Sequence, residues 1–216
     1  MKVKVLILYV SSLLISCNQI SSETEKLIAN TEKRQPKAKK TIIIQPFEGL
    51  PQSTTQFVAQ QLKEIYSGEV TVNNAIPLPQ HALNYNKKRY RADSLIRYLG
   101  TLVKGNQIII GLTNKNISTT KGKHSDWGVM GLGNCPGKSC IASTFKLKGK
   151  NRLEKLYKVA IHELGHNHGL ANTKTKHCPE KTCLMRDAEG KDHLNELKAF
   201  CSKCKPVLIN AGWKLD

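Results

Sequence analysis

Aromatic and acidic side chains are both scarce in this sequence. Phe, Trp and Tyr make up 6% of its 216 residues, and 16 acidic residues stand against 34 Lys and Arg, which gives a formal net charge of +18. A surface this basic can attract nucleic acid, anionic lipid headgroups or acidic peptides. Basic runs such as residues 37–40 and 146–150 contain no aromatic side chain that could stack on bases, which weighs against nucleic acid. We interpret these runs as solvated tether and loop.

The apolar run near the N-terminus lacks the length of a membrane span. It covers residues 5–15 and follows Lys2 and Lys4, a pattern typical of a secretory signal. The run ends in Leu-Ile-Ser before Cys17, which resembles the lipobox of bacterial lipoproteins, where the signal is cut before the cysteine and that cysteine receives lipid. We therefore predict a signal at residues 1–17 and lipidation of Cys17. The alternative is an uncleaved anchor, or a cut elsewhere.

The segment after the predicted signal indicates a tether followed by one domain. Residues 18–40 are polar, lack aromatic residues and show no apolar periodicity, as expected of a flexible tether. Residues 41–216 have the length of a single domain and contain no internal repeat. Together these features predict an exported protein, lipid-anchored to the bacterial cell envelope on its periplasmic side or at the cell surface. Export argues further against a nucleic-acid partner.

Apolar periodicity within the domain alternates between strands and helices. We expect strands at residues 41–44, 69–72 and 107–112, with helices at 53–66 and 92–99 between them. This order predicts an α/β domain with a mixed sheet and crossover connections. Further on, the pattern indicates short strands at 127–132 and 140–147 at the rim of a cleft, a long helix at 152–168, and a last helix within 187–200 that begins near Lys191.

The long helix carries the pentapeptide His-Glu-Leu-Gly-His from His162 to His166. Two histidines four residues apart lie on one helix face and can bind one metal ion. Neutral imidazoles hold zinc with one position open for water, whose pKa falls toward ~7, and Glu163 stands beside them to take its proton. Short motifs also recur by chance, so a helix that merely contains the pentapeptide is the alternative.

Gly169 follows the second histidine at the spacing found in the extended motif of metzincins. Glycine can adopt a positive φ there and end the helix sharply, so that the chain turns back and brings a third ligand to the metal. The alternative is a glycine that serves only as a helix cap, which needs the same backbone geometry. If the motif binds zinc, the third ligand has to lie further along the chain.

Seven cysteines fall into three groups. Cys17 belongs to the predicted lipobox, whereas Cys135 and Cys140 stand alone and favour either a small loop disulfide or two thiols. The remaining four form two close pairs in the C-terminal part: Cys178, Cys183, Cys201 and Cys204. Four thiolates so arranged suit a closed tetrahedral zinc site, which would staple the C-terminal subdomain to the cleft. Two disulfides are the alternative, because export leads to an oxidising compartment.

The segment from His177 to Cys204 completes a recognisable signature. His177-Cys178, then Cys183, Met185 and the final Cys-Ser-Lys-Cys resemble the archaemetzincins, whose pattern joins the metzincin helix to these elements in this order. The match covers residues 162–204, and similarity extends back through residues 127–133 and 84–86 to the first strand. The resemblance implies a zinc-dependent peptidase with a metzincin-like mixed α/β fold and peptide or protein substrates. It assigns a catalytic Zn²⁺ to His162, His166 and His177, general-base function to Glu163, the turn beneath the site to Met185, and a structural Zn²⁺ to the four cysteines.

The chain departs from the family pattern at the third histidine. In the family this residue comes three positions after the glycine, where this chain has Asn172, and His177 follows only after five additional residues. We expect His177 to be the ligand, because imidazole binds zinc far better than an amide oxygen does. The additional residues are polar and carry two lysines, so they can loop into solvent. The alternative is that Asn172 or water completes the site.

Other histidines and one rival function complete the expectations. His81, His124, His168 and His193 lie off the motif and are expected at the surface or in hydrogen bonds.

The rival function is a non-catalytic zinc module that presents a binding surface for a peptide or an envelope partner. Glu163 discriminates between the two, because such a module needs no base beside its metal. These patterns leave the oligomeric state open.

Overall fold

The computed structural model describes residues 39–170, 177–188 and 191–215. The predicted signal and residues 18–38 of the predicted tether, Cys17 included, lie outside the described residues, and so does Asn172. The described residues belong to one compact unit that begins at Lys39. Within them, every helix is too short or too polar to cross a membrane.

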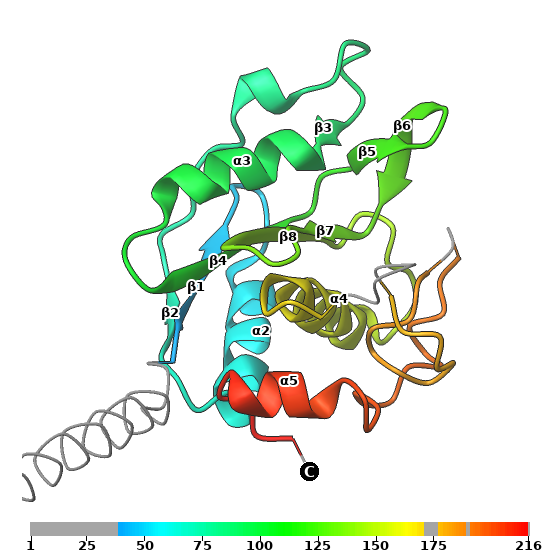
Figure 1. Ribbon diagram of the computed structural model, residues 1–216. Helices are drawn as coiled ribbons and strands as arrows, with labels where there is room; N and C mark the ends of the chain where they lie inside the picture. Colours follow the sequence, from blue (N-terminus) through cyan, green and yellow to red (C-terminus); the bar gives the residue numbers. More distant parts are fainter. Residues whose placement is uncertain (1–38, 171–176, 189–190, 216) are drawn as a thin grey trace, which may run out of the picture. The chain divides into compact units, whose positions relative to one another are not determined.

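A five-stranded sheet forms the centre of this unit (Figure 1). Its strands, in spatial order, are β2 (Val70–Val72), β1 (Thr41–Pro46), β4 (Gln107–Thr113), β8 (Ser139–Ser143) and β7 (Gly131–Gly133). The first four are parallel, and β7 runs antiparallel to β8 at the edge. The central strands β1 and β4 are buried on both faces, which explains why they read as runs of isoleucine and not as alternating patterns.

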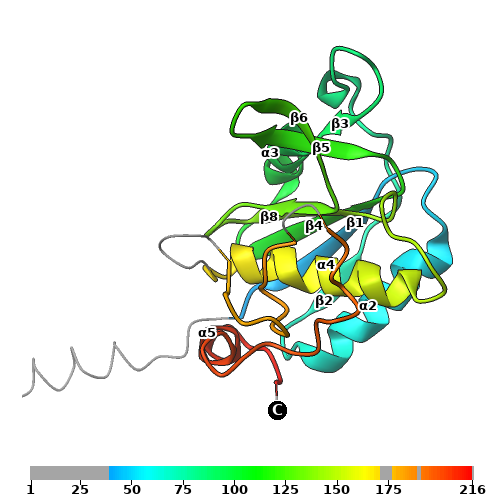
Figure 2. The same ribbon diagram turned by 90° about the vertical axis from the view of Figure 1, so that its right-hand side faces the viewer.

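Helices cover both faces of this sheet, as Figures 1 and 2 show. One face packs against α2 (Gln52–Ile65) and α4 (Arg152–Asn167), and the other against α3 (Ala92–Leu102). The short helix α5 (Lys205–Asn210) lies beyond α2 and α4, on the side away from the sheet. Successive strand residues point to opposite sides, so Ile42 and Ile44 enter the core beneath α2 and α4 while Ile43 enters the core beneath α3. The His-Glu-Leu-Gly-His motif thus lies on a helix that is packed directly on the sheet.

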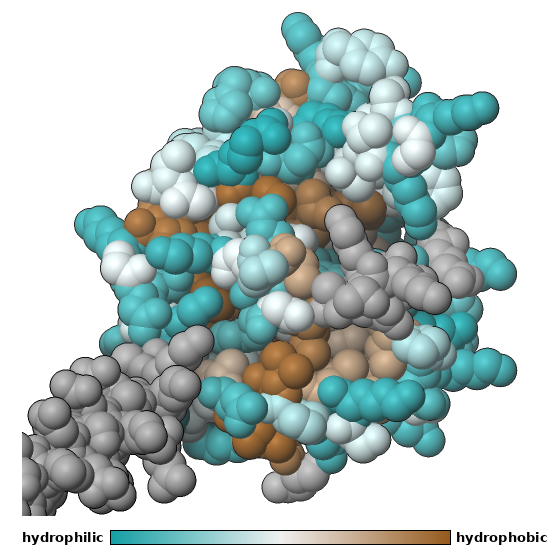
Figure 3. Space-filling view, in the orientation of Figure 1, coloured by the Kyte–Doolittle hydropathy of each residue, from teal (hydrophilic) through white to brown (hydrophobic). Residues whose placement is uncertain are grey.

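The short helix α5 buries only one of its faces in the core. Leu208 is fully buried, whereas Val207 and Ile209 are 39% and 48% exposed. The resulting apolar surface over α5 is visible in Figure 3. The C-terminal segment beyond α5 continues the core, because Trp213 is buried against the ring of Tyr66, with the ring centroids 5.6 Å apart.

A second, three-stranded sheet lies on the α3 side of the main sheet (Figures 1 and 2). It contains β3 (Tyr90–Arg91), β5 (Ile117–Lys121) and β6 (His124–Val129) in the order β3-β5-β6, and a 3-10 helix (Gln80–Ala82) precedes it. The β5–β6 pair is an antiparallel hairpin. After β6 the chain passes through Met130 directly into β7, which connects this sheet to the edge of the main sheet.

The predicted α/β fold with a mixed sheet is confirmed, but three local predictions are wrong. The expected strand at 140–147 ends at Ser143, and as β8 it lies inside the sheet between β4 and β7, away from the rim of the cleft. The expected strand at 127–132 is divided at Met130 between β6 and β7, which belong to different sheets. The expected helix near Lys191 is also absent, since the described part of 187–200 consists of turns and bridges and the last helix is α5. Backbone groups of this segment bond to the cysteine loop instead, with Leu184 N donating to Ala199 O at 2.9 Å and Lys198 N to Thr182 O at 2.9 Å.

Gly111 in β4 offers a test of the packing between the sheet and α3. A Cβ atom there would lie 2.7 Å from Leu99 Cδ1 and 3.0 Å from a carbon of Phe47, so Gly111→Ala should lower the free energy of unfolding by about 1–3 kcal/mol in urea titrations. Gly100→Ala is the matched control, because its Cβ meets only Ser139 Oγ at 3.6 Å, and it should raise that free energy by about 0.5–1 kcal/mol. Equal effects of the two changes would contradict the described packing.

Candidate metal centres and active-site cleft

Helix α4 ends in the way that the motif requires. Gly169 has a φ of +92°, and its amide donates to His166 O at 2.9 Å. The next amide, of Leu170, donates to Gly165 O at 3.0 Å. These two bonds form a Schellman motif, in which glycine occupies the left-handed position. The helix therefore ends at Asn167, directly after the second histidine, with Gly169 making the turn that the sequence predicted.

His162 and His166 are oriented by backbone carbonyls. His162 Nδ1 lies 2.6 Å from Leu184 O, and His166 Nδ1 lies 2.8 Å from Leu170 O. A carbonyl can only accept, so each Nδ1 carries the proton and each Nε2 presents its lone pair. The two Nε2 atoms are 3.2 Å apart. Two nitrogens bound tetrahedrally to zinc at about 2.0–2.1 Å would be separated by about 3.3–3.4 Å, so the pair fits zinc.

His177 joins this pair despite the additional residues before it. Its ring centroid lies 5.3 Å from that of His162 and 5.1 Å from that of His166, and one ring nitrogen from each of the three lies within 4.8 Å of the others. His177 Nδ1 faces a carboxylate oxygen of Asp187 at 3.6 Å. The structure thus brings together the three histidines that the sequence singled out.

The electrostatics of the cluster favour neutral imidazoles. Burial, followed by the neighbouring His166, lowers the pKa of His162 to about 3. His162 is therefore uncharged at neutral pH, and its Nε2 lone pair is available to a cation.

Glu163 is buried beside the histidines, next to the edge strand β7. Its residue is 7% exposed, and no described residue pairs with its carboxylate or donates a hydrogen bond to it. Burial raises the pKa of Glu163 to about 8. Strand β7 can approach so closely because it is rich in glycine: a Cβ on Gly131 would lie 2.5 Å from Glu163 Oε1, and one on Gly133 would lie 2.8 Å from Glu163 O. An unpaired buried carboxylate in a cleft is typical of a functional site.

Met185 lies beneath the histidine cluster. It is 1% exposed, and a Cβ on Gly165 of α4 would lie 2.7 Å from its sulphur. Because residue 165 has no side chain, Met185 packs against the helix backbone between the two histidines. The neighbouring Leu184 supplies the carbonyl that orients His162. The role of Met185 as the turn beneath the site stays a prediction.

The four C-terminal cysteines form a second cluster. The sulphurs of Cys178 and Cys201 are 3.6 Å apart, those of Cys183 and Cys204 are 3.8 Å apart, and all four lie within 4.8 Å of one another. Sulphurs bound tetrahedrally to zinc at about 2.3 Å would be about 3.8 Å apart, whereas a disulfide would hold two of them at about 2.05 Å. No disulfide joins any two of the described cysteines, Cys135 and Cys140 included.

The remaining histidines contact aromatic rings or acidic groups. The ring of His168 lies 6.4 Å from that of Tyr66 and 5.8 Å from that of Trp213, and burial lowers its pKa to about 4. His193 Nδ1 lies 2.9 Å from a carboxylate oxygen of Glu196. His81 and His124 contact Tyr98 and Trp127, respectively. None of these four belongs to either described metal-ligand cluster.

A cleft of about 720 Å³ opens over the histidine cluster and Glu163. Its walls include residues 127–133, whose first six the sequence placed at the rim of a cleft, and also residues that the sequence did not indicate, from β5 (119–121) and from residues 186–197. Two α4 lysines hold the latter segment: Lys155 Nζ contacts Asp192 Oδ2 at 2.6 Å, and Lys158 Nζ donates to Leu194 O at 3.1 Å. These contacts join residues more than 30 positions apart, and no local pattern marks them.

The sequence of this chain is similar to those of archaemetzincins. No protein-family model matches the chain. The archaemetzincin of Methanopyrus kandleri is 28% identical over 148 residues, which cover 66% of this chain and 79% of that protein. The archaemetzincin of Archaeoglobus fulgidus is 28% identical over 167 residues, which cover 76% of this chain and 95% of that protein.

Solved structures agree with the sequence relatives. The M. kandleri archaemetzincin has a TM-score of 0.66 at 26% identity, covering 82% of this chain and 98% of that one. The A. fulgidus archaemetzincin, complexed with malonate, has a TM-score of 0.65 at 26% identity, with 77% and 99% covered. A zinc-dependent peptidase from Methanocorpusculum labreanum, 19% identical with a TM-score of 0.62, shares the fold over 77% of this chain and 99% of its own.

In sequence and in fold the chain is archaemetzincin-like over most of its length, and this similarity supports a zinc metallopeptidase. The family likeness, the fold class and the enzyme class predicted from the sequence are thereby confirmed. Zinc is supported by the relatives' names and by the two clusters, one of histidines and one of cysteines.

The third ligand can be tested by paired substitutions. His177→Ala should weaken binding of one zinc by more than about 100-fold, because even changes outside the ligand shell cost about 10–100-fold. Asn172→Ala should leave both zinc affinities within about twofold, if the insertion loops outward as its polar sequence indicates. Competition titration with a chromophoric chelator measures both variants. A larger loss in Asn172→Ala would overturn the choice of His177.

Proposed function

We propose that this chain hydrolyses peptide bonds as a zinc-dependent peptidase, with His162, His166 and His177 holding the catalytic zinc and Glu163 as general base. One observation carries the proposal: three imidazoles converge beside a buried carboxylate that has no described partner, and all of them line one cleft. The predicted substrates are peptides or proteins, as for the archaemetzincins and the zinc-dependent peptidase that the chain resembles.

Zinc in the histidine site would supply Lewis acidity, which polarises a peptide carbonyl and brings the pKa of water toward ~7. Glu163 takes the proton from the attacking water and delivers it to the amine of the leaving product. Its buried position suits this task, because a raised pKa makes the ionised carboxylate a stronger base and lets it hold the abstracted proton until the amine leaves. The carbonyls of Leu184 and Leu170 keep the two imidazoles in the tautomer that binds metal.

Strand β7 is suited to position the substrate. It is the edge strand of the main sheet as described, and its three residues line the cleft beside Glu163. An unpaired edge offers backbone donors and acceptors to an extended peptide. Binding along this edge would place the scissile carbonyl next to the histidine cluster.

The proposal includes a second, structural zinc held by Cys178, Cys183, Cys201 and Cys204. The sulphur separations support zinc over disulfides, and the cluster joins the loop after His177 to the segment before α5. Such a closed site contributes folding free energy and no chemistry. Each chain would then bind two zinc ions, one catalytic and one structural.

The alternative, a non-catalytic zinc module, has less support. A module that only presents a binding surface gains nothing from burying the unpaired carboxylate of Glu163, which costs free energy. The same residue therefore distinguishes the two functions by experiment.

Glu163→Gln should lower kcat/KM on a cleaved peptide by about 10²–10⁴-fold, the usual contribution of general-base catalysis. Elemental analysis should still find two zinc ions per chain, because the carboxylate is not a ligand in this proposal. Glu154→Gln is the matched control, since Glu154 lies on the same helix with a 54% exposed side chain and should leave activity unchanged. Wild-type turnover in Glu163→Gln would refute the mechanism. A wild-type protein with two zinc ions that cleaves no peptide would favour the binding module.

We also propose that the mature protein is anchored to the bacterial cell envelope by lipid on Cys17. The support is the sequence alone: two lysines, an apolar run and a lipobox-like tripeptide precede this cysteine. The anchor would hold the peptidase at a membrane through the tether of residues 18–40.

Mass spectrometry of the N-terminal peptide, extracted from membranes, should show an acylated Cys17 as the first residue. Cys17→Ser should lose the acyl group and move the protein from the membrane fraction to the soluble fraction, because a lipid chain contributes about 0.8 kcal/mol of membrane affinity per buried CH₂. A wild-type N-terminus at another residue would remove the anchor from the proposal.

A further inference from the structure

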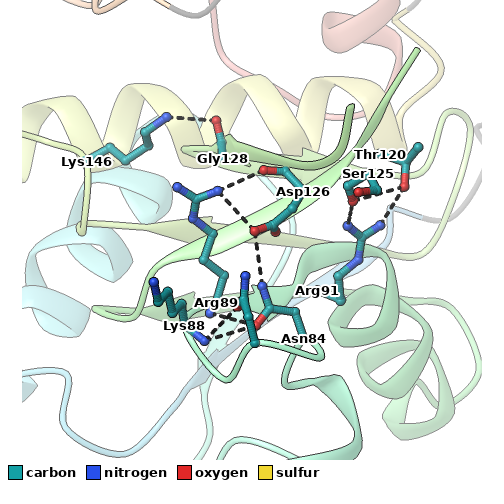
Figure 4. A network of polar contacts seen from close by, with 10 residues as sticks. Asn84, Lys88, Arg89, Arg91, Thr120, Ser125, Asp126, Gly128 and Lys146 are labelled. Atoms are coloured by element: carbon teal, nitrogen blue, oxygen red, sulfur yellow. Dashed lines mark hydrogen bonds and ion pairs between the residues drawn. The ribbon is translucent and has the colours of Figure 1, made fainter. Parts of the chain in front are cut away.

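A polar network fixes the β5–β6 wall of the cleft (Figure 4). Asp126 in β6 is held from two directions: Arg89 Nη1 contacts its Oδ2 at 3.2 Å and its carbonyl at 2.8 Å, and Asn84 Nδ2 donates to Oδ2 at 3.2 Å. The only described ion-pair partner of Arg89 is thus Asp126. The negative charge of this wall is neutralised within the network.

Lys146 adds a second cation to the same wall. Its Nζ donates to Gly128 O at 2.8 Å (Figure 4), and a Cβ on Gly128 would lie 3.1 Å from Lys146 Nζ and 3.8 Å from the guanidinium carbon of Arg89. No described carboxylate lies within ion-pair distance of Lys146. Partial burial, and then the charge of Arg89, lower the pKa of Lys146. An anion beside this ammonium would stabilise its charged form and so oppose both effects.

The Lys146 ammonium lies within reach of the proposed reaction centre. Lys146 and Gly128 line the same cleft as Glu163. Gly128 precedes Gly131 by three residues, so their Cα atoms are at most about 11 Å apart, and Gly131 lies directly against Glu163. Three residues of an extended peptide span about the same distance.

The other charges of the cleft leave its walls positive. Asp192 forms an ion pair with Lys155 at 2.6 Å, and Arg186 forms one with Glu196 at 2.7 Å. Lys121 lies over the ring of Trp127, 5.5 Å from its centroid, and no carboxylate in the described part of the chain lies within ion-pair distance of it. Among the described residues, the lysines of the cleft have no carboxylate partner, whereas its aspartates already face cations or His177.

We infer that Lys146 is a specificity-determining residue that selects peptides with a carboxylate within about three residues of the scissile bond. This inference rests on the proposed peptidase function and names a substrate class for the same cleft. The carboxylate can belong to an Asp or Glu side chain or to the C-terminus of a short peptide. Lys146 donates a charge-assisted hydrogen bond to it while the main chain of the substrate lies along the cleft.

The test uses a panel of matched fluorogenic peptides on the zinc-loaded protein. A single Glu or Gln is moved along an otherwise uncharged sequence, and each peptide is made with a free or an amidated C-terminus to separate the two sources of carboxylate. Wild type should cleave the best Glu or free-acid peptide about 3–10 times faster, in kcat/KM, than its Gln or amide partner. The ratio should fall to about 1 in Lys146→Gln and persist in Lys146→Arg, which keeps the charge.

Lys148→Gln is the matched control. Lys148 is exposed in the same loop but does not line the cleft, so this variant should keep the wild-type ratio. Equal cleavage of all pairs by wild type would overturn the inference and leave the peptidase proposal standing. A ratio that survives in Lys146→Gln would also overturn it.

Binding separates failure of the inference from failure of the proposed function. Fluorescence anisotropy with the same pairs on zinc-loaded Glu163→Gln should show a similar preference without turnover. If wild type cleaves nothing but the preference in binding is present and depends on Lys146, the carboxylate site stands and the peptidase proposal falls. Equal affinities for every pair would overturn the site regardless of activity.

Discussion

The hydrogen bond between His162 and the carbonyl of Leu184 is the contact on which the arrangement of both clusters depends. It joins α4, which carries the motif, to the loop that carries the cysteines. The residue before Leu184 is Cys183, and the residue after it is Met185, which packs against Gly165. Three consecutive residues thus supply a sulphur to one cluster, orient an imidazole of the other and fill the space beneath it. A shift of these three residues would therefore disturb both clusters.

Placement of His177 follows from the same loop. Cys178, its neighbour, donates its amide to Met185 O at 2.7 Å, so His177 is held from its C-terminal side. The length of the segment between Gly169 and His177 then matters little, because each doubling of a flexible loop costs only about 0.6 kcal/mol of closure entropy. This explains how five additional residues can precede the third histidine without removing it from the cluster. Spacing along the chain therefore predicts the position of a metal ligand poorly where a contact made by its C-terminal neighbour fixes that position.

Features encoded locally could be predicted from the sequence, and features made by distant contacts could not. Helix α4, its two histidines and the glycine that ends it follow from periodicity and from the conformational freedom of glycine. The segment 187–200 has a helical pattern too, but its backbone at Lys198 and Ala199 pairs with the cysteine loop, and tertiary contacts override the local preference. The division at Met130 has a similar origin, since neither strand on its own reveals which sheet it joins. Lys146 belongs to the cleft only because β6 passes beside it, which no motif marks.

The adjacency of Cys183 and Leu184 also has a thermodynamic consequence. If occupancy of the cysteine cluster rigidifies this loop, the ordering cost of aligning His162 is met before the histidine cluster receives its own ion. Linkage is reciprocal, so an ion among the histidines must strengthen binding at the cysteines by the same factor. The two centres then behave as one cooperative unit. The ion in the cysteine cluster, which contacts no substrate, would set the zinc concentration at which the histidine cluster fills. Scarcity of zinc would accordingly produce a mixture of fully loaded and empty chains, with few half-loaded ones.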